Sequence, residues 1–241
     1  IDAHVHLRDE GKAYEEDFHS GTAAAAAGGI TTVLDMPNND PVTMSAETLR
    51  NRMKSAEKRI LVNVGFYSEF PRNMREIQKT VEAGAASFKL FMSEQVGELN
   101  VDDDNALSEA FRILTALNVS VAVHAEDKTM IEKTEGRLKG ANRNDIKAFL
   151  DAHSELAEER AVKRVLSLAK KTVTRIHFCH VSTKNGLEAI ADGKKSNASI
   201  TCEATPHHLF LSVEDLRRTG TLALTRPPVR EKRHIAALWG G

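Results

Sequence analysis

The stretch Ile1-Asp2-Ala3-His4-Val5-His6-Leu7-Arg8 opens the chain and begins an alternation of strands and helices that predicts the fold. His4 and His6 lie two residues apart, so in a β-strand their side chains share one face. Two adjacent imidazoles suit a metal ion, but a polar strand end with two unrelated histidines explains the short pattern equally well. The residues at the ends of the later strands distinguish between these two interpretations.

Apolar, β-branched segments alternate with segments of helical pattern along the rest of the chain. Further strands are predicted over 30–34, 60–67, 86–92, 119–124, 174–179 and 199–203. Helices are predicted over 17–28, 45–58 with Ser45 as N-cap, 73–83, 105–117, 153–171, 183–194 and 212–218, and from 230 onward. The insertion 126–152 is predicted to form a lid or an extra helix.

This order predicts an α/β fold and, more specifically, a TIM-type (β/α)8 barrel. A doubly wound sheet is the alternative, but no glycine-rich phosphate loop follows any strand. About seven βα units are present in a chain of 241 residues, whereas such a barrel has eight in roughly 250. We expect a single catalytic barrel domain over residues 1–241 that is incomplete at both ends.

The composition excludes several classes of function. The chain has 33 Lys and Arg against 34 Asp and Glu, a formal net charge of -1, which argues against nucleic-acid binding and a polybasic membrane surface. No apolar run approaches the ~18 residues of a membrane span, and the first residues do not resemble a signal peptide. The two cysteines, Cys179 and Cys202, form no CxxC motif, which predicts a reducing cytoplasm.

Polar residues recur at the ends of the predicted strands, where a barrel of this type carries its active site. His124 ends the fifth strand, His180 follows the sixth, and Lys89 stands between apolar residues in the fourth. Each histidine taken alone could be structural, but four at strand ends together favour a metal site. Burial favours a neutral Lys89 amine, which can react with carbon dioxide to form a carbamate. A lysine that reaches solvent along the strand is the simpler explanation from these residues alone.

Longer motifs then identify a family. They are 2–8 with its HxH, 16–21, 23–33, Met36-Pro37-Asn38, Ser87-Phe88-Lys89-Leu90-Phe91-Met92, His124-Ala125-Glu126, His180-Val181-Ser182 and Pro206-His207-His208-Leu209. In this order they closely resemble the dihydroorotases of the cyclic amidohydrolase family, over essentially the whole chain.

The resemblance implies a zinc-dependent, reversible cyclisation of N-carbamoyl-L-aspartate to L-dihydroorotate in pyrimidine biosynthesis. Two Zn²⁺ ions are implied, one held by His4 and His6, the other by His124 and His180, with carboxylated Lys89 as the bridge. Arg8 and Asn38 match residues that hold the substrate carboxylate, a role that suits an arginine fork. The family's catalytic aspartate has no match, and we expect it beyond Gly241. The resemblance also allows a homodimer and an association with aspartate carbamoyltransferase.

Two alternatives remain open at this point. A dihydropyrimidinase, hydantoinase or allantoinase shares the metal site without needing a carboxylate-binding arginine. An inactive dihydroorotase-like scaffold for aspartate carbamoyltransferase is the second, although the five implied metal ligands are all retained. The family's small β-sandwich and eighth strand have no counterpart in the sequence, and Arg226-Pro227-Pro228-Val229-Arg230 replaces the usual Asn-Pro-Pro-Leu-Arg.

The remaining histidines and cysteines are predicted to have structural roles. His177 lies on the strand face opposite to His180. His207 and His208 follow the seventh strand, where the alternative is that one of them lines the site. We expect surface positions for His19, His153 and His234, and core positions for Cys179 and Cys202.

Overall fold

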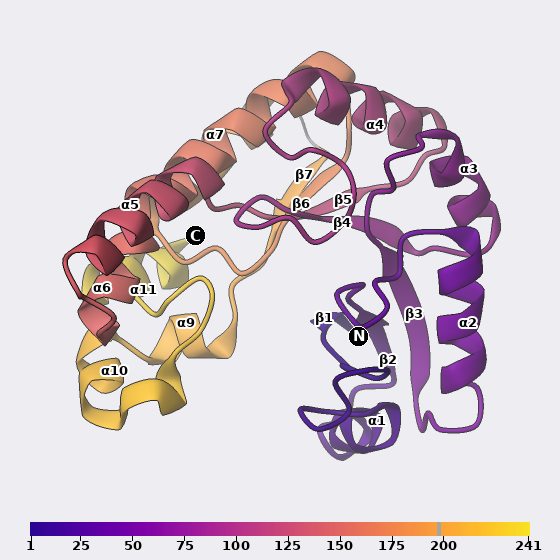
Figure 1. Cartoon of the computed structure of the whole chain (residues 1–241), viewed down its shortest axis with the longest axis horizontal. Coiled ribbons are helices and arrows are strands. Elements are labelled where there is room, and N and C mark those ends of the chain that lie inside the picture. The colour runs from indigo at the N-terminus through magenta and orange to yellow at the C-terminus, as the bar shows by residue number, and fades with distance from the viewer. Residues whose placement is uncertain (197–198) are drawn as a thin grey trace. The chain divides into compact units, whose positions relative to one another are not determined.

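The computed structural model describes residues 1–196 and 199–241, and in it seven strands form a sheet in sequence order (Figure 1). The strands are β1 (Asp2–Val5), β2 (Thr32–Asp35), β3 (Asn63–Ser68), β4 (Ser87–Phe91), β5 (Val121–His124), β6 (Ile176–Phe178) and β7 (Ile200–Cys202). The pairs β1–β2, β2–β3, β3–β4 and β6–β7 are parallel. Parallel strands in sequence order, each joined to the next through a helix, confirm the predicted α/β fold of the barrel type.

The helices match most of the predicted segments. They are α1 (Phe18–Ala27), α2 (Ala46–Ala56), α3 (Arg75–Glu82), α4 (Asp104–Ala116), α5 (Lys128–Gly140), α6 (Ile146–Ala152), α7 (Glu155–Thr172), α8 (Lys184–Ser196), α9 (Pro206–Phe210), α10 (Val213–Thr219), the 3-10 helix η1 (Gly220–Ala223) and α11 (Lys232–Gly240). The 126–152 insertion contains two helices, α5 and α6. The short helix α9 was not predicted, although it begins with proline, a favoured first helical residue.

The chain divides into two compact units, which are described separately. Unit 1 comprises residues 1–90 and 95–122, and unit 2 comprises residues 91–94 and 123–241. The single domain expected from the sequence stays a prediction. None of the helices in the described part of the chain has the length and apolarity needed to cross a membrane.

In unit 1 a buried ion pair joins the end of β1 to β2 and α2. The Asp35 carboxylate at the end of β2 accepts hydrogen bonds from Arg52, at 3.1 Å from Nε, and from the backbone N–H of Leu7, at 2.9 Å. Helix α2 starts at the predicted N-cap, Ser45, whose side chain accepts from the N–H of Thr48. Because Leu7 follows His6 directly, this contact holds the backbone beside the HxH pair.

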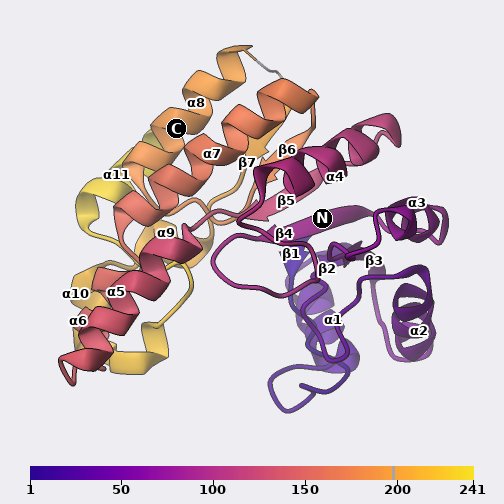
Figure 2. The same ribbon diagram turned by 45° about the horizontal axis from the view of Figure 1, so that its top comes forward.

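In unit 2 the long helices α7 and α8 pack side by side along the parallel strands β6 and β7 (Figure 2). Val162, Val165 and Leu168 form part of the buried stripe of α7, as its 3.6-residue periodicity predicts. Strand β6 continues into Cys179, whose N–H donates to the carbonyl of Val123 on β5 at 3.0 Å. The loops that leave β5 and β6 therefore start from neighbouring strands.

Candidate functional site

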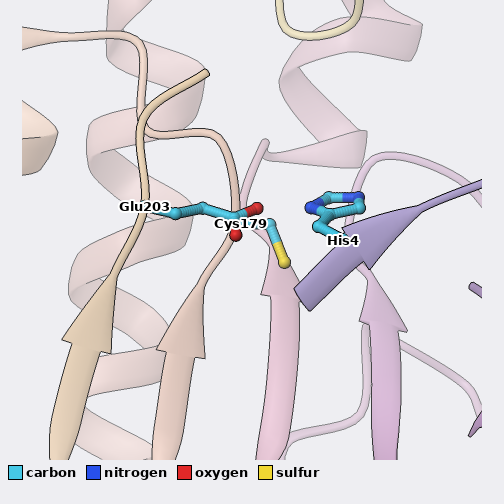
Figure 3. Close-up of side chains that lie close together, drawn as sticks. All are labelled: His4, Cys179 and Glu203. Atoms are coloured by element: carbon cyan, nitrogen blue, oxygen red, sulfur yellow. The ribbon is translucent and has the colours of Figure 1, made fainter. Parts of the chain in front are cut away.

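His4 and His6 in unit 1 bring two imidazole nitrogens to a spacing that fits zinc. His4 lies on β1 (Figure 3), and its Nε2 atom is 3.3 Å from Nε2 of His6. Two nitrogen ligands at the usual Zn–N distance of about 2.0–2.1 Å and a tetrahedral angle are about 3.3–3.4 Å apart. The pair therefore has the geometry of two ligands of one ion, and its donor set suits zinc.

Asn38 orients the ring of His6. Its Oδ1 atom lies 2.7 Å from Nδ1 of His6, so Nδ1 carries the proton and Nε2 keeps its lone pair. Burial, together with the positive charges of His4, Lys89 and Arg8, lowers the pKa of His6 well below its ordinary value, and the Asn38 hydrogen bond only partly opposes this shift. His6 is thus neutral at pH 7, as a metal ligand must be.

Lys89 lies at the centre of β4 and is fully buried. Its side chain therefore does not reach solvent along the strand, which was the simpler explanation from the sequence. Phe88, Leu90 and Phe91 beside it are also buried. The amine of Lys89 thus lies among apolar side chains, and its carbamate stays a prediction.

Arg8 follows the HxH pair and is partly buried. Its Nε atom forms an ion pair with Glu15 at 3.1 Å, and its φ of 56° places the backbone in the left-handed region. A residue other than glycine at positive φ is uncommon, and such strain is typical of functional sites. Glu15, the partner of this guanidinium, has a side chain that is 41% exposed.

In unit 2 the histidines that follow β5 and β6 form a second pair. His124 ends β5, and its Nδ1 atom lies 3.1 Å from Nε2 of His180. This separation is again close to that of two nitrogen ligands on one zinc ion. His180 has a φ of 35°, and its backbone N–H donates to Oε1 of Glu203 at 3.3 Å.

Glu203 and His177 support the turn that carries His180. Glu203 follows β7 and Cys179 follows β6 (Figure 3). Oε2 of Glu203 pairs with Nε2 of His177 at 3.1 Å, and Nδ1 of His177 contacts Oγ1 of Thr201 at 2.9 Å. His177 is therefore engaged in structural contacts, in line with its predicted role.

Glu126 is a residue that the sequence indicated only as part of a family motif. Its carboxylate, 1% exposed, lies between Nε2 of His124 at 2.8 Å and Nδ1 of His153 at 3.0 Å. Burial alone would raise the pKa of this carboxyl, but the hydrogen bonds from His124 and His153 lower it below its ordinary range. The spacing of His124 and Glu126, two residues apart at a strand end, was the available signal.

The predicted surface positions of His153 and His234 are wrong, because both side chains are buried. His153 is held by Glu126, and Nδ1 of His234 accepts the backbone N–H of Lys184 at 2.9 Å. Both partners are distant in sequence, so the local polar pattern gave no sign of burial. His19 is exposed and Cys179 is buried as predicted, whereas Cys202 is exposed instead of lying in the core.

A second buried carboxylate, Glu158 on α7, holds the segment that follows His180. It accepts hydrogen bonds from the backbone N–H and hydroxyl groups of Ser182 and Thr183. Arg230, at the end of the Arg-Pro-Pro-Val-Arg stretch, donates from Nε to Oγ of Ser182 at 2.9 Å and from Nη1 to the carbonyl of His153. Arg230 therefore ties two segments beside the His124–His180 pair together.

Comparisons with known proteins identify the family of this chain. Residues 1–224 match the amidohydrolase family. The chain is 35% identical over 252 residues to a dihydroorotase of Methanosarcina acetivorans, covering 100% of this chain and 52% of the relative. It is 30% identical to an allantoinase of Enterococcus faecalis, covering 99% and 55%.

A solved structure gives the same result for the fold. An L-hydantoinase (dihydropyrimidinase) from Arthrobacter aurescens matches with a TM-score of 0.92 at 30% identity, covering 99% of this chain and 53% of that one. The chain thus spans about half the length of the curated relatives that it matches. It belongs to the amidohydrolase family, as predicted from its motifs.

Proposed function

We propose that this chain belongs to a dihydroorotase that interconverts N-carbamoyl-L-aspartate and L-dihydroorotate. The observation that carries the proposal is the spacing of two histidine pairs, His4–His6 in unit 1 and His124–His180 in unit 2. In each pair the two imidazole nitrogens lie as far apart as two ligands of one zinc ion. The similarity to dihydroorotases over the full chain supports the choice within the family.

The residues present fit zinc by their chemistry. Each pair offers two imidazole nitrogens, the commonest nitrogen ligands of zinc. Bound zinc supplies a water of lowered pKa and polarises the amide carbonyl of a cyclic substrate. Lys89 is the residue that would carry the carbamate, and its role as a bridge between two ions stays a prediction from the sequence.

Arg8 and Asn38 are proposed to select the substrate. An arginine guanidinium can bind a carboxylate through two parallel hydrogen bonds, and dihydroorotate carries a carboxylate beside its ring amide. Asn38 contacts His6 through Oδ1, and we propose its amide N–H groups as the donors to a substrate oxygen. These residues would hold the substrate in the orientation needed for ring closure. Such orientation can remove a large part of the activation barrier.

A cyclic amidase acting on allantoin, hydantoin or dihydropyrimidines is the second candidate. The 0.92 TM-score to an L-hydantoinase and the 30% identity to an allantoinase favour it. The ion pair between Arg8 and Glu15 also favours it, because an arginine already neutralised binds a substrate carboxylate less strongly. For both candidates we propose a cytoplasmic enzyme with a small-molecule substrate. Homodimer formation and an association with aspartate carbamoyltransferase are proposed only for the dihydroorotase.

The test combines metal analysis with a substrate panel. We expect about two zinc ions per chain and turnover of L-dihydroorotate without turnover of hydantoin or allantoin. Turnover of hydantoin or allantoin alone would establish the second candidate, and carefully purified protein without zinc would favour a metal-free scaffold. Lys89→Ala should abolish activity unless a short carboxylic acid is added, whereas Lys79→Ala, at an exposed position on α3, should not change it.

A further inference from the structure

The side chain of Glu126 lies behind the imidazole of His124, on the side away from His180. Its two oxygens face two ring nitrogens, Nε2 of His124 and Nδ1 of His153. An ionised carboxylate only accepts hydrogen bonds, so both of these nitrogens carry protons. In neutral His124 the lone pair is therefore on Nδ1, the atom that lies 3.1 Å from His180.

This arrangement reverses the ring of His124 relative to its counterpart in unit 1. His6 is protonated on Nδ1, where it meets Asn38, and turns Nε2 toward His4. His124 instead is protonated on Nε2 and turns Nδ1 toward His180. The acceptor behind each ring, an amide oxygen for His6 and a carboxylate for His124, determines which nitrogen is free.

The carboxylate of Glu126 is itself firmly held. His153 lies between the last residue of α6 and Ser154, the N-cap of α7, and is 3% exposed. Its backbone carbonyl accepts from Nη1 of Arg230, whose Nε donates to Ser182. A buried carboxylate is costly unless its oxygens are paired, and here two imidazoles pair both of them.

Building on the proposed function, we propose that Glu126 is a positioning residue, anchored by His153, that holds His124 in the Nε2–H tautomer and directs Nδ1 to the metal. A carboxylate behind a ligating imidazole raises its basicity and fixes its orientation, and loss of such a partner typically lowers metal affinity 10–100-fold. The effect is confined to the His124–His180 pair, because the His4–His6 pair is oriented by Asn38.

The direct test is the tautomer of His124 in the metal-free full chain. Long-range ¹H–¹⁵N spectra of ¹⁵N-histidine protein distinguish the two neutral tautomers, and His124→Gln identifies the signals. We expect the Nε2–H form in the parent protein and a mixture of tautomers in Glu126→Leu. Glu132→Gln on α5, which removes a carboxylate that is 65% exposed, is the matched control and should match the parent.

Zinc binding provides the second readout. Competition with a chelator should show one of two sites weakened 10–100-fold in Glu126→Leu and the other unchanged. Glu126→Gln, which keeps one acceptor oxygen, should be weakened less and serves as the test if the leucine variant does not fold. His153→Phe should give an intermediate loss of zinc affinity. It removes the hydrogen bond that anchors Glu126 but leaves the Glu126 carboxylate as the acceptor for His124.

The outcomes separate this inference from the proposed function. A parent protein without zinc would contradict the proposed function, while the tautomer measurement would still test the role of Glu126. A parent that binds zinc, with folded Glu126→Leu or Glu126→Gln retaining both the affinity and the Nε2–H tautomer, would overturn the inference alone.

Discussion

The imidazole of His208 should make the protein sensitive to mild acid. His208 lies on α9, is 2% exposed, and contacts the carbonyl of Pro227 through Nε2 at 3.1 Å and the hydroxyl of Thr205 through Nδ1 at 2.7 Å. Since a carbonyl only accepts, Nε2 carries the proton and Nδ1 accepts from the threonine. Burial is the main cause that lowers the pKa of His208 to about 3.

The sign and size of the effect follow from proton linkage. In the unfolded chain histidine has a pKa of about 6.5, so between about pH 6.5 and 3 the unfolded state binds the proton and the native state does not. Stability is therefore lost as the pH falls through this window. From pH 7 to pH 4.5 the loss due to His208 alone is about 2.5 kcal/mol, at 1.36 kcal/mol per unit of pKa difference.

The assay is urea unfolding of the parent and of His208→Gln at both pH values. Glutamine keeps an amide donor and an acceptor but does not titrate, and all other titrating groups are common to both proteins. The parent should lose about 2.5 kcal/mol more than the variant, whereas the exposed-site control His19→Gln should follow the parent. A difference below about 0.5 kcal/mol between parent and His208→Gln would refute the reasoning.

Two further substitutions test the packing within each unit. In unit 1, Arg52→Met leaves the buried carboxylate of Asp35 without its cation. This should lower the free energy of unfolding, measured by urea unfolding, by about 3–5 kcal/mol. A loss under about 1 kcal/mol would contradict this account. In unit 2, Gly186→Ala places a methyl group 2.7 Å from a Glu158 oxygen and should lower the free energy of unfolding by about 1–3 kcal/mol. The control is Gly136→Ala on α5, where the added methyl group enters open space and should be neutral or stabilising.

The alternation of strands and helices was predictable because it depends on local periodicity. Each predicted strand overlaps an observed one, and α7 shows the apolar stripe expected from its sequence. Helix starts such as Ser45 were also readable, since a cap acts on N–H groups two or three residues away. The short helix α9 and the two helices of the insertion carry weaker patterns and were missed or only partly foreseen.

The candidate ligands were predictable for a different reason. His4 and His6 share a strand face by their spacing, and His124 and His180 occur at strand ends, where this fold class carries its chemistry. The sequence could not show which ring nitrogen of His6 and of His124 carries the proton. That depends on an acceptor behind the ring, Asn38 for His6, which is 32 residues away.

By itself, then, the sequence determined the strand order, the family and the residue types at the site, because these follow from periodicity and motifs along the chain. Only the tertiary structure decided that Lys89 is fully buried and that His153 is a buried partner of Glu126. It also decided that Arg8 pairs with Glu15. The energies of such contacts depend on distance and burial in space, and residues distant along the chain supply both.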